Sequence, residues 1–252
     1  MMRRVLITIE YDGGPFVGWQ RQDNGLSVQG ALEDAAAAFI KAPTPVAGAG
    51  RTDAGVHATG QAAHLDIPAR FTPNRVVEAL NAHLAALPIT VITARHVPDD
   101  FHARFSAVGR RYLYRILPRR QRPSLERGRV WHHKAPLDVQ SMARATRHLI
   151  GRHDFTSFRA SHCQADSPVR TLDRLDIETV GHEIHIHAEA RSFLHHQVRN
   201  ITGSLAMVGR GKWHPDDMRE ILAAADRRIA GPTAPAEGLY LVGVDYPLAS
   251  RD

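Results

Sequence analysis

The sequence predicts an α/β protein made of two halves that each mix strands and helices. The chain has 252 residues, more than one typical domain and fewer than two large ones. Strand and helix patterns alternate over the first hundred residues, and a second mixed series follows a basic, aromatic passage at residues 100–123. Because strands and helices must bury their apolar faces against one another, we expect two packed halves, residues 1–105 and 106–252.

The first half is predicted to begin with a strand at residues 4–10, which turn and loop signals follow. A helix comes next. Ser27 is placed to cap this helix, apolar residues from Val28 to Phe39 recur on one of its faces, and Pro43 lies beyond its end. After a glycine-rich loop, residues 61–67 are expected to form a second strand.

Thr72 and Pro73 are expected to be the N-cap and first residue of a second helix, which lies before Pro88. A strand at residues 89–97 then completes the first half. The elements expected in the second half are a strand at 111–117, a helix at 139–150, strands at 171–180 and 182–190, a long helix with an apolar stripe from Leu194 to Val208 that ends at Gly209 and Gly211, a short helix from Pro215 and a strand at 238–247.

The composition is that of an ordinary globular protein with a basic bias. Hydrophobic residues make up 43% of the chain and charged residues 23%, which is enough apolar material for a core. Lys and Arg outnumber Asp and Glu by 32 to 26, so the net charge is +6 and the pI is about 10.0. A polyanion is therefore a natural partner, although net charge predicts non-specific attraction as readily as functional binding.

Cysteine usage and hydropathy predict a protein of the cytoplasm. Cys163 is the one cysteine, so an intrachain disulfide and a cysteine-rich zinc site are both excluded. The apolar stretch at residues 5–10 is too short for the core of a signal peptide, and no window approaches the length of a membrane span. We therefore expect a soluble protein that is not exported and has no membrane partner.

The loop sequence GAGRTDAGVHA at residues 48–58 holds the first candidate for chemistry. Its glycines allow backbone conformations closed to other residues, and Thr52 and Asp53 are common in turns. Asp53 is either a turn residue that bonds its own backbone or a catalytic carboxylate with Arg51 nearby to hold an anion. The loop lacks the Gly-Lys-Ser/Thr ending of a phosphate-binding P-loop and does not match the dinucleotide-binding pattern.

The sequence RRYLYR at residues 110–115 predicts a strand with Tyr112 and Tyr114 on one face. Such a pair is either half-buried core or a surface on which a nucleobase stacks while nearby arginines contact phosphates. In the long helix, Arg199 is either a surface residue or a charge that points into a cleft. In a cleft it needs an anionic partner such as Asp53, and an Asp held by Arg stays ionised, as a nucleophile or base must.

Sixteen histidines raise the possibility of a metal site. The candidate ligands are the two residues of the strand pair His185 and His187, and the adjacent pairs His132–His133 and His195–His196. No recognised pattern supplies a third ligand, so exposed or hydrogen-bonded histidines are the simpler interpretation.

Taken together, the motifs resemble those of the TruA-type tRNA pseudouridine synthases. The resemblance runs almost from end to end. It is carried, in chain order, by YDGGPFVGWQRQ, SVQGALEDA, GAGRTDAGVHATGQ, DFHARFSA, RRYLYR, DFTSFRA, HHQVRNITG and EGLYLVGVDYP. One departure is Gln197, which stands where a Met usually precedes Val-Arg, and it affects local helix packing more than chemistry.

The resemblance implies that Asp53 is the catalytic residue, that Tyr112 stacks on the target uracil and that Arg199 pairs with the Asp53 carboxylate. The arginines expected to bind the substrate are Arg21, Arg51, Arg110 and Arg111. It also implies the pseudouridine synthase fold, with largely antiparallel sheets and a catalytic cleft between the halves, and a homodimer. The implied activity is isomerisation of uridines 38, 39 and 40 in the anticodon stem-loop of tRNA, without cofactor or metal.

This chemistry agrees with the residues. The isomerisation breaks the bond from C1′ to N1 and forms one from C1′ to C5 without redox change, and a stacked uridine must first be flipped into a pocket. Asp53 can attack C1′, add to the base or take a proton from the ribose, and all three routes remain open. Two other classes of protein also remain open: a non-catalytic RNA-binding module, and a His-ligated metal hydrolase.

Overall fold

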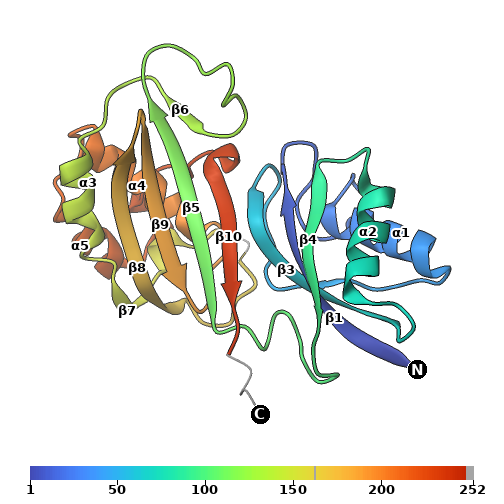
Figure 1. Ribbon diagram of the computed structural model, residues 1–252. Coiled ribbons are helices and arrows are strands. Elements are labelled where there is room, and N and C mark those ends of the chain that lie inside the picture. The colour runs from blue at the N-terminus through green and yellow to red at the C-terminus, as the bar shows by residue number, and fades with distance from the viewer. Residues whose placement is uncertain (162, 248–252) are drawn as a thin grey trace. The chain divides into compact units, whose positions relative to one another are not determined.

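The computed structural model describes residues 1–161 and 163–247, and in it the chain divides into two compact units (Figure 1). Of the described residues, the first unit contains 1–108 and 240–247, and the second contains those from 109 to 239. The predicted α/β class with largely antiparallel sheets is confirmed. The division differs from the predicted halves, because the last strand lies with the first unit.

The first unit contains a sheet in the order β4-β1-β3-β10, with the short β2 paired to β3. Its strands are β1 (Met2–Tyr11), β2 (Ala47–Gly48), β3 (His57–Pro68), β4 (Ile89–His96) and β10 (Leu239–Asp245). β1 pairs antiparallel with both β3 and β4. β10 runs parallel to β3, with Tyr240 opposite His57, and this pairing joins the end of the chain to the first unit.

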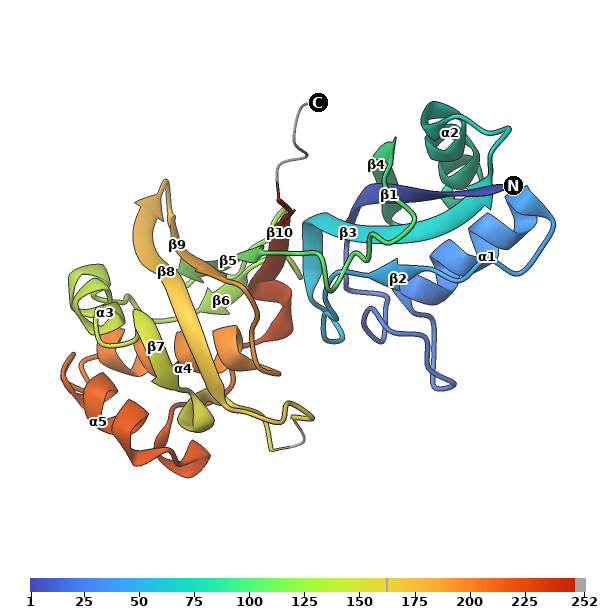
Figure 2. The ribbon, with the colours of Figure 1, turned by 90° about the horizontal axis from the view of Figure 1, so that it is seen from below.

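Two helices, α1 (Val28–Ile40) and α2 (Pro73–Leu84), lie on one face of this sheet (Figures 1 and 2). Both begin where the sequence predicts, because the cap is a local interaction. The Ser27 side chain accepts a hydrogen bond from the Gly30 amide, and the Thr72 side chain accepts one from the Arg75 amide. Lys41, the residue after the last residue of α1, adopts a left-handed conformation and ends the helix.

The second unit contains a sheet in the order β5-β9-β8-β7, with β6 parallel to β5. Its strands are β5 (Gly109–Pro118), β6 (Trp131–His133), β7 (Gly151–Asp154), β8 (Val169–Val180) and β9 (Glu183–Ala190). Its α-helices are α3 (Val139–Thr146), α4 (Gln197–Gly209) and α5 (Asp217–Ala224), and its 3-10 helices are η1 (Thr156–Phe158), η2 (Arg227–Ile229) and η3 (Ala236–Gly238). Figure 1 shows α3, α4 and α5 on one side of the sheet.

Alternation along β9 explains how this sheet is oriented. Ile184, Ile186 and Ala188 are buried, whereas His185 and His187 point to the opposite, polar face. Alternate residues of β9 therefore face the core and the polar side of the sheet, and the helices cover the apolar side.

Two predicted helices are shorter than expected. The helix predicted at 139–150 ends at Thr146, because Gly151 begins β7 and the residues between form turns. The apolar stripe predicted from Leu194 onward begins before its helix, which starts at Gln197. Leu194 is buried all the same, and its amide donates to the Gln197 side chain at 2.8 Å. None of the helices in the described ranges is long and apolar enough to cross a membrane.

Candidate active site

The loop that carries Asp53 is held by a buried hydrogen bond to β1. The hydroxyls of Thr52 and Tyr11 lie 2.8 Å apart, and both residues are buried. Burial raises the pKa of Tyr11 to about 12, so the phenol is neutral at physiological pH. The neighbouring Asp53 is half-buried. The loop therefore fixes the backbone of the candidate catalytic residue through the side chain next to it.

Backbone contacts complete the support of this loop. The Thr52 carbonyl accepts a hydrogen bond from the Trp19 amide at 3.0 Å, and the Asp53 carbonyl accepts one from the Val56 amide at 3.1 Å. Gly18 is required here, because its φ is +118° and a Cβ would lie 2.8 Å from the Thr52 carbonyl oxygen. The loop is thus closed by main-chain bonds on both sides of Asp53.

The predicted substrate-binding arginines of the first unit are both exposed. Arg51 follows Gly50, whose carbonyl is held by the Gln61 side chain at 2.8 Å. Arg21 lies in the segment before α1, where its guanidinium bonds Glu33 and Asp34, each at 2.9 Å. Exposed ion pairs of this kind contribute little to stability, so Arg21 can exchange its carboxylate partners for phosphates at low cost.

On β5 the two tyrosines have different environments. Tyr114 is fully buried, and its hydroxyl donates to the Pro235 carbonyl at 2.7 Å, so its role is in the core. Tyr112 is half-buried, and its ring meets the ring of Phe193 edge to face, with centroids 5.1 Å apart. Tyr112 is therefore the more exposed of the two tyrosines, and its predicted stacking on a uracil stays a prediction.

The two arginines that precede Tyr112 also differ. Arg110 is buried, and its guanidinium donates to the Arg191 carbonyl at 2.6 Å. Arg111 is exposed and lies opposite Glu189 of β9. Since neighbouring residues of a strand point to opposite faces, Arg111 and Tyr112 do not share a face, whereas Arg110 and Tyr112 do.

Arg199 occupies the first turn of α4 and is half-buried. Its Nε donates to the Ala234 carbonyl at 2.8 Å, and its own carbonyl accepts a hydrogen bond from the Ala234 amide at 3.1 Å. Its side chain is therefore oriented by a backbone segment that lies far along the chain. The predicted site residues divide between the units, with Arg21, Arg51 and Asp53 in the first and Arg110, Arg111, Tyr112 and Arg199 in the second.

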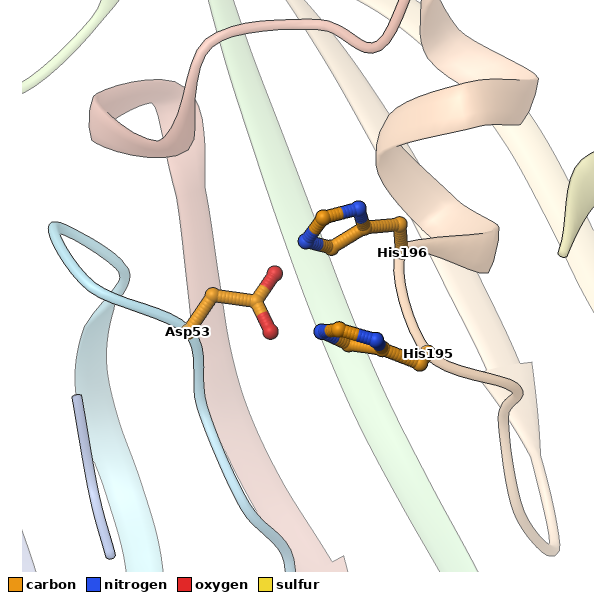
Figure 3. A group of neighbouring side chains, drawn as sticks. All are labelled: Asp53, His195 and His196. Atoms are coloured by element: carbon orange, nitrogen blue, oxygen red, sulfur yellow. The ribbon is translucent and has the colours of Figure 1, made fainter. Parts of the chain in front are cut away.

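The pair His132–His133 forms hydrogen bonds with backbone carbonyls. His132 bonds the Arg119 carbonyl at 2.8 Å, and His133 bonds the Ala135 carbonyl at 2.7 Å. Figure 3 shows His195 and His196 at the start of α4 and also draws Asp53 of the first unit. The centroids of the two imidazole rings lie 4.0 Å apart. A left-handed conformation at His196 turns the chain into the helix.

The other pair lies on the polar face of the second sheet. Ligand atoms of Glu178, His185 and His187 lie within 4.8 Å of one another. His187 bonds Glu178 at 2.8 Å, and His185 bonds Glu183 at 2.9 Å. Burial raises the pKa of Glu183, but hydrogen bonds from Arg115 and His185 outweigh this effect and leave the pKa lowered. Hydrogen bonds within β9 and between β8 and β9 are therefore sufficient to explain the cluster.

Comparisons with known proteins identify the family. Residues 7–106 and 145–247 match the family model described as tRNA pseudouridine synthase, so the chain belongs to this family of RNA-modifying isomerases. The tRNA pseudouridine synthase A of Paramagnetospirillum magneticum is 57% identical over 245 residues, which cover 97% of this chain and 96% of that protein. The enzyme of the same name from Cereibacter sphaeroides is 56% identical over 250 residues, or 98% of each chain. That from Rhodospirillum centenum is 55% identical over 97% of this chain and the whole of the relative.

Proposed function

We propose that this protein isomerises uridine to pseudouridine in the anticodon stem-loop of tRNA, at positions 38, 39 and 40, with Asp53 as the catalytic carboxylate. Membership of the tRNA pseudouridine synthase family supports the reaction and the tRNA substrate. The observation that carries the role of Asp53 is its loop, in which the buried Tyr11–Thr52 bond and main-chain bonds from both sides fix the backbone. Such fixation is what a group that must meet one atom of a bound ribose or base requires.

Residues of both units act on the same uridine in this proposal. Tyr112 stacks on the flipped uracil, and Arg199 pairs with the Asp53 carboxylate and keeps it ionised. The exposed Arg21, Arg51 and Arg111 contact phosphates, and the buried Arg110 supports the strand that carries Tyr112. The enzyme acts as a homodimer in the cytoplasm.

The reaction constrains what else is needed. One glycosidic bond is exchanged for another at C1′, and the proton on C5 leaves as the new bond forms. Oxidation state does not change, so the reaction needs no redox cofactor. The proposal includes no metal ion either. Asp53 acts by attack on C1′, by addition to the base or by deprotonation of the ribose.

The decisive experiment measures tritium release from unmodified tRNA transcripts labelled at C5 of uridine. Wild-type protein is compared with Asp53→Asn, which is nearly isosteric, and with Asp99→Asn, which makes the same change of charge at an exposed position of the first unit. Release by wild type and Asp99→Asn, and none by Asp53→Asn with tRNA binding retained, supports the proposal. Tight binding without release by any protein would favour a non-catalytic RNA-binding module, and mapping of the product positions tests the choice of uridines.

A further inference from the structure

A short segment after η2, which we call the 230–235 strap, lies against α4 of the same unit. The strap has the sequence Ala-Gly-Pro-Thr-Ala-Pro. It approaches the helix so closely that a Cβ at Gly203 would collide with the Pro232 carbonyl oxygen. The Gly231 amide donates to the Ser204 hydroxyl at 2.9 Å, and that hydroxyl donates in turn to the Asn200 carbonyl at 2.9 Å. The main chain of the strap is therefore in direct contact with the helix.

A fully buried amide, that of Asn200, joins the strap to the interior of the unit. Its Nδ2 donates to the Phe158 carbonyl at 2.9 Å. Its Oδ1 accepts hydrogen bonds from the Thr233 hydroxyl at 2.6 Å and from the Arg227 guanidinium at 3.1 Å. Since a guanidinium can only donate, the amide has one orientation, and all of its contacts act together to hold the strap.

The Arg227 guanidinium adds further bonds to the same segment. It donates to the Gly231 carbonyl at 2.9 Å and to the Thr233 hydroxyl at 3.2 Å. These acceptors and Asn200 are neutral, and burial lowers the pKa of Arg227, which stays charged at physiological pH. At its far end, the strap is held by the buried Tyr114, whose hydroxyl donates to the Pro235 carbonyl.

Between these two anchors lies Ala234, the residue that contacts Arg199. The Ala234 carbonyl accepts from Arg199 Nε, and the Ala234 amide donates to the Arg199 carbonyl. An arginine side chain has many rotamers, and a fixed acceptor at Nε selects among them and directs the two terminal nitrogens. A displacement of the strap therefore moves the hydrogen-bond partner that orients Arg199.

We propose that Asn200, Arg227 and Thr233 are positioning residues for Arg199, acting through the 230–235 strap. The inference rests on the proposed function, in which Arg199 pairs with Asp53 during isomerisation. In a purely structural role these residues would affect only the stability of the protein, whereas positioning residues also affect the rate of the chemical step. Catalysis is sensitive to small misplacements of a group that orients a reacting residue.

The test uses threonine variants that either remove or keep the hydroxyl. Thr233→Val removes the hydroxyl that bonds Asn200, and Thr233→Ser retains it. Thr202→Val is the control. Thr202 is fully buried in α4, the helix that also carries Arg199, and its hydroxyl has no hydrogen-bond partner within the described residues. Each variant is assayed for the single-turnover rate of tritium release, for the Kd of tRNA and for its melting temperature, at a temperature where circular dichroism shows every variant folded.

We expect Thr233→Val to release tritium about tenfold more slowly, since a loss of about 1.4 kcal/mol of transition-state stabilisation is a factor of ten in rate. Its Kd for tRNA is expected to stay within about twofold, whereas Thr233→Ser and Thr202→Val are expected to keep the wild-type rate. A lower melting temperature with an unchanged rate for Thr233→Val would overturn the inference and leave the strap a structural element. An absence of release by the wild type would instead overturn the proposed function, so the two failures are distinguishable.

Discussion

The buried hydrogen bond between Tyr11 and Thr52 offers a sharp test of how the Asp53 loop is held. Tyr11→Phe removes one hydroxyl of the pair and leaves the Thr52 hydroxyl buried, whereas Thr52→Val leaves the Tyr11 hydroxyl with the Gln61 side chain as a hydrogen-bond partner. A buried polar group that loses its partner costs about 1–3 kcal/mol, whereas removal of both partners can be nearly neutral. Tyr11→Phe is therefore expected to lose about 2 kcal/mol of unfolding free energy, roughly a 30-fold change in the unfolding equilibrium, and Thr52→Val a smaller amount.

The double variant Tyr11→Phe/Thr52→Val is expected to lose clearly less than the sum of the two single losses. Urea denaturation followed by circular dichroism measures all four proteins, and the coupling free energy is the difference from additivity. Tritium release is expected to fall in the single variants, because the backbone at Asp53 is less well fixed. Additive losses of stability, or a Tyr11→Phe protein as stable as wild type, would refute the account of the loop.

Four further outcomes are expected. Tyr112→Phe keeps stacking and retains most tritium release, whereas Tyr112→Ala loses it; equal inactivity of both would mean that the hydroxyl takes part in the chemistry. If Arg21, Arg51 and Arg111 neutralise three phosphates, the Kd for tRNA rises roughly 20- to 40-fold between 50 and 200 mM salt, and a flat response would contradict phosphate binding. Chelation by EDTA leaves tritium release unchanged, whereas a loss restored by Zn²⁺ would point to a metal enzyme. Burial lowers the pKa of His64 to about 4, and repulsion from Arg4 and His102 adds to this effect. The free energy of unfolding that the neutral His64 side chain contributes is therefore fully present above about pH 6.5 and is lost as the pH falls through 4. The free energy of unfolding is measured against pH for wild type and for His64→Gln. Curves with the same pH dependence would contradict this contribution.

Local signals in the sequence predicted the helices of the first unit well, because caps act over a few residues. Ser27 and Thr72 bond amides three residues ahead, and these contacts depend on nothing else in the fold. The apolar stripe of α4 predicted which face of the helix is buried, but it did not predict at which residue the helix begins. The start at Gln197 follows a left-handed residue, His196, and such a conformation has no hydrophobic pattern to reveal it.

Long-range pairing accounts for what the sequence could not predict. The pairing of Tyr240 with His57 places the last strand in the first unit, and neither residue carries a signal for the other. The short strands β2 and β6 exist only because neighbouring strands supply their partners. A boundary drawn along the chain necessarily missed a strand that returns to the unit where the chain began.

The sequence alone determined the family, the class of chemistry and the candidate residues, because a series of motifs in a specific order can be recognised without knowledge of the fold. Only the tertiary structure decided which of two tyrosines is buried, and which buried hydroxyl supports Asp53. It also revealed that Ala234 orients Arg199, 35 positions away in the chain. The physical reason is the same in each case: a hydrogen bond between distant residues depends on how the chain folds back, and neither partner alone has a sequence pattern that encodes it.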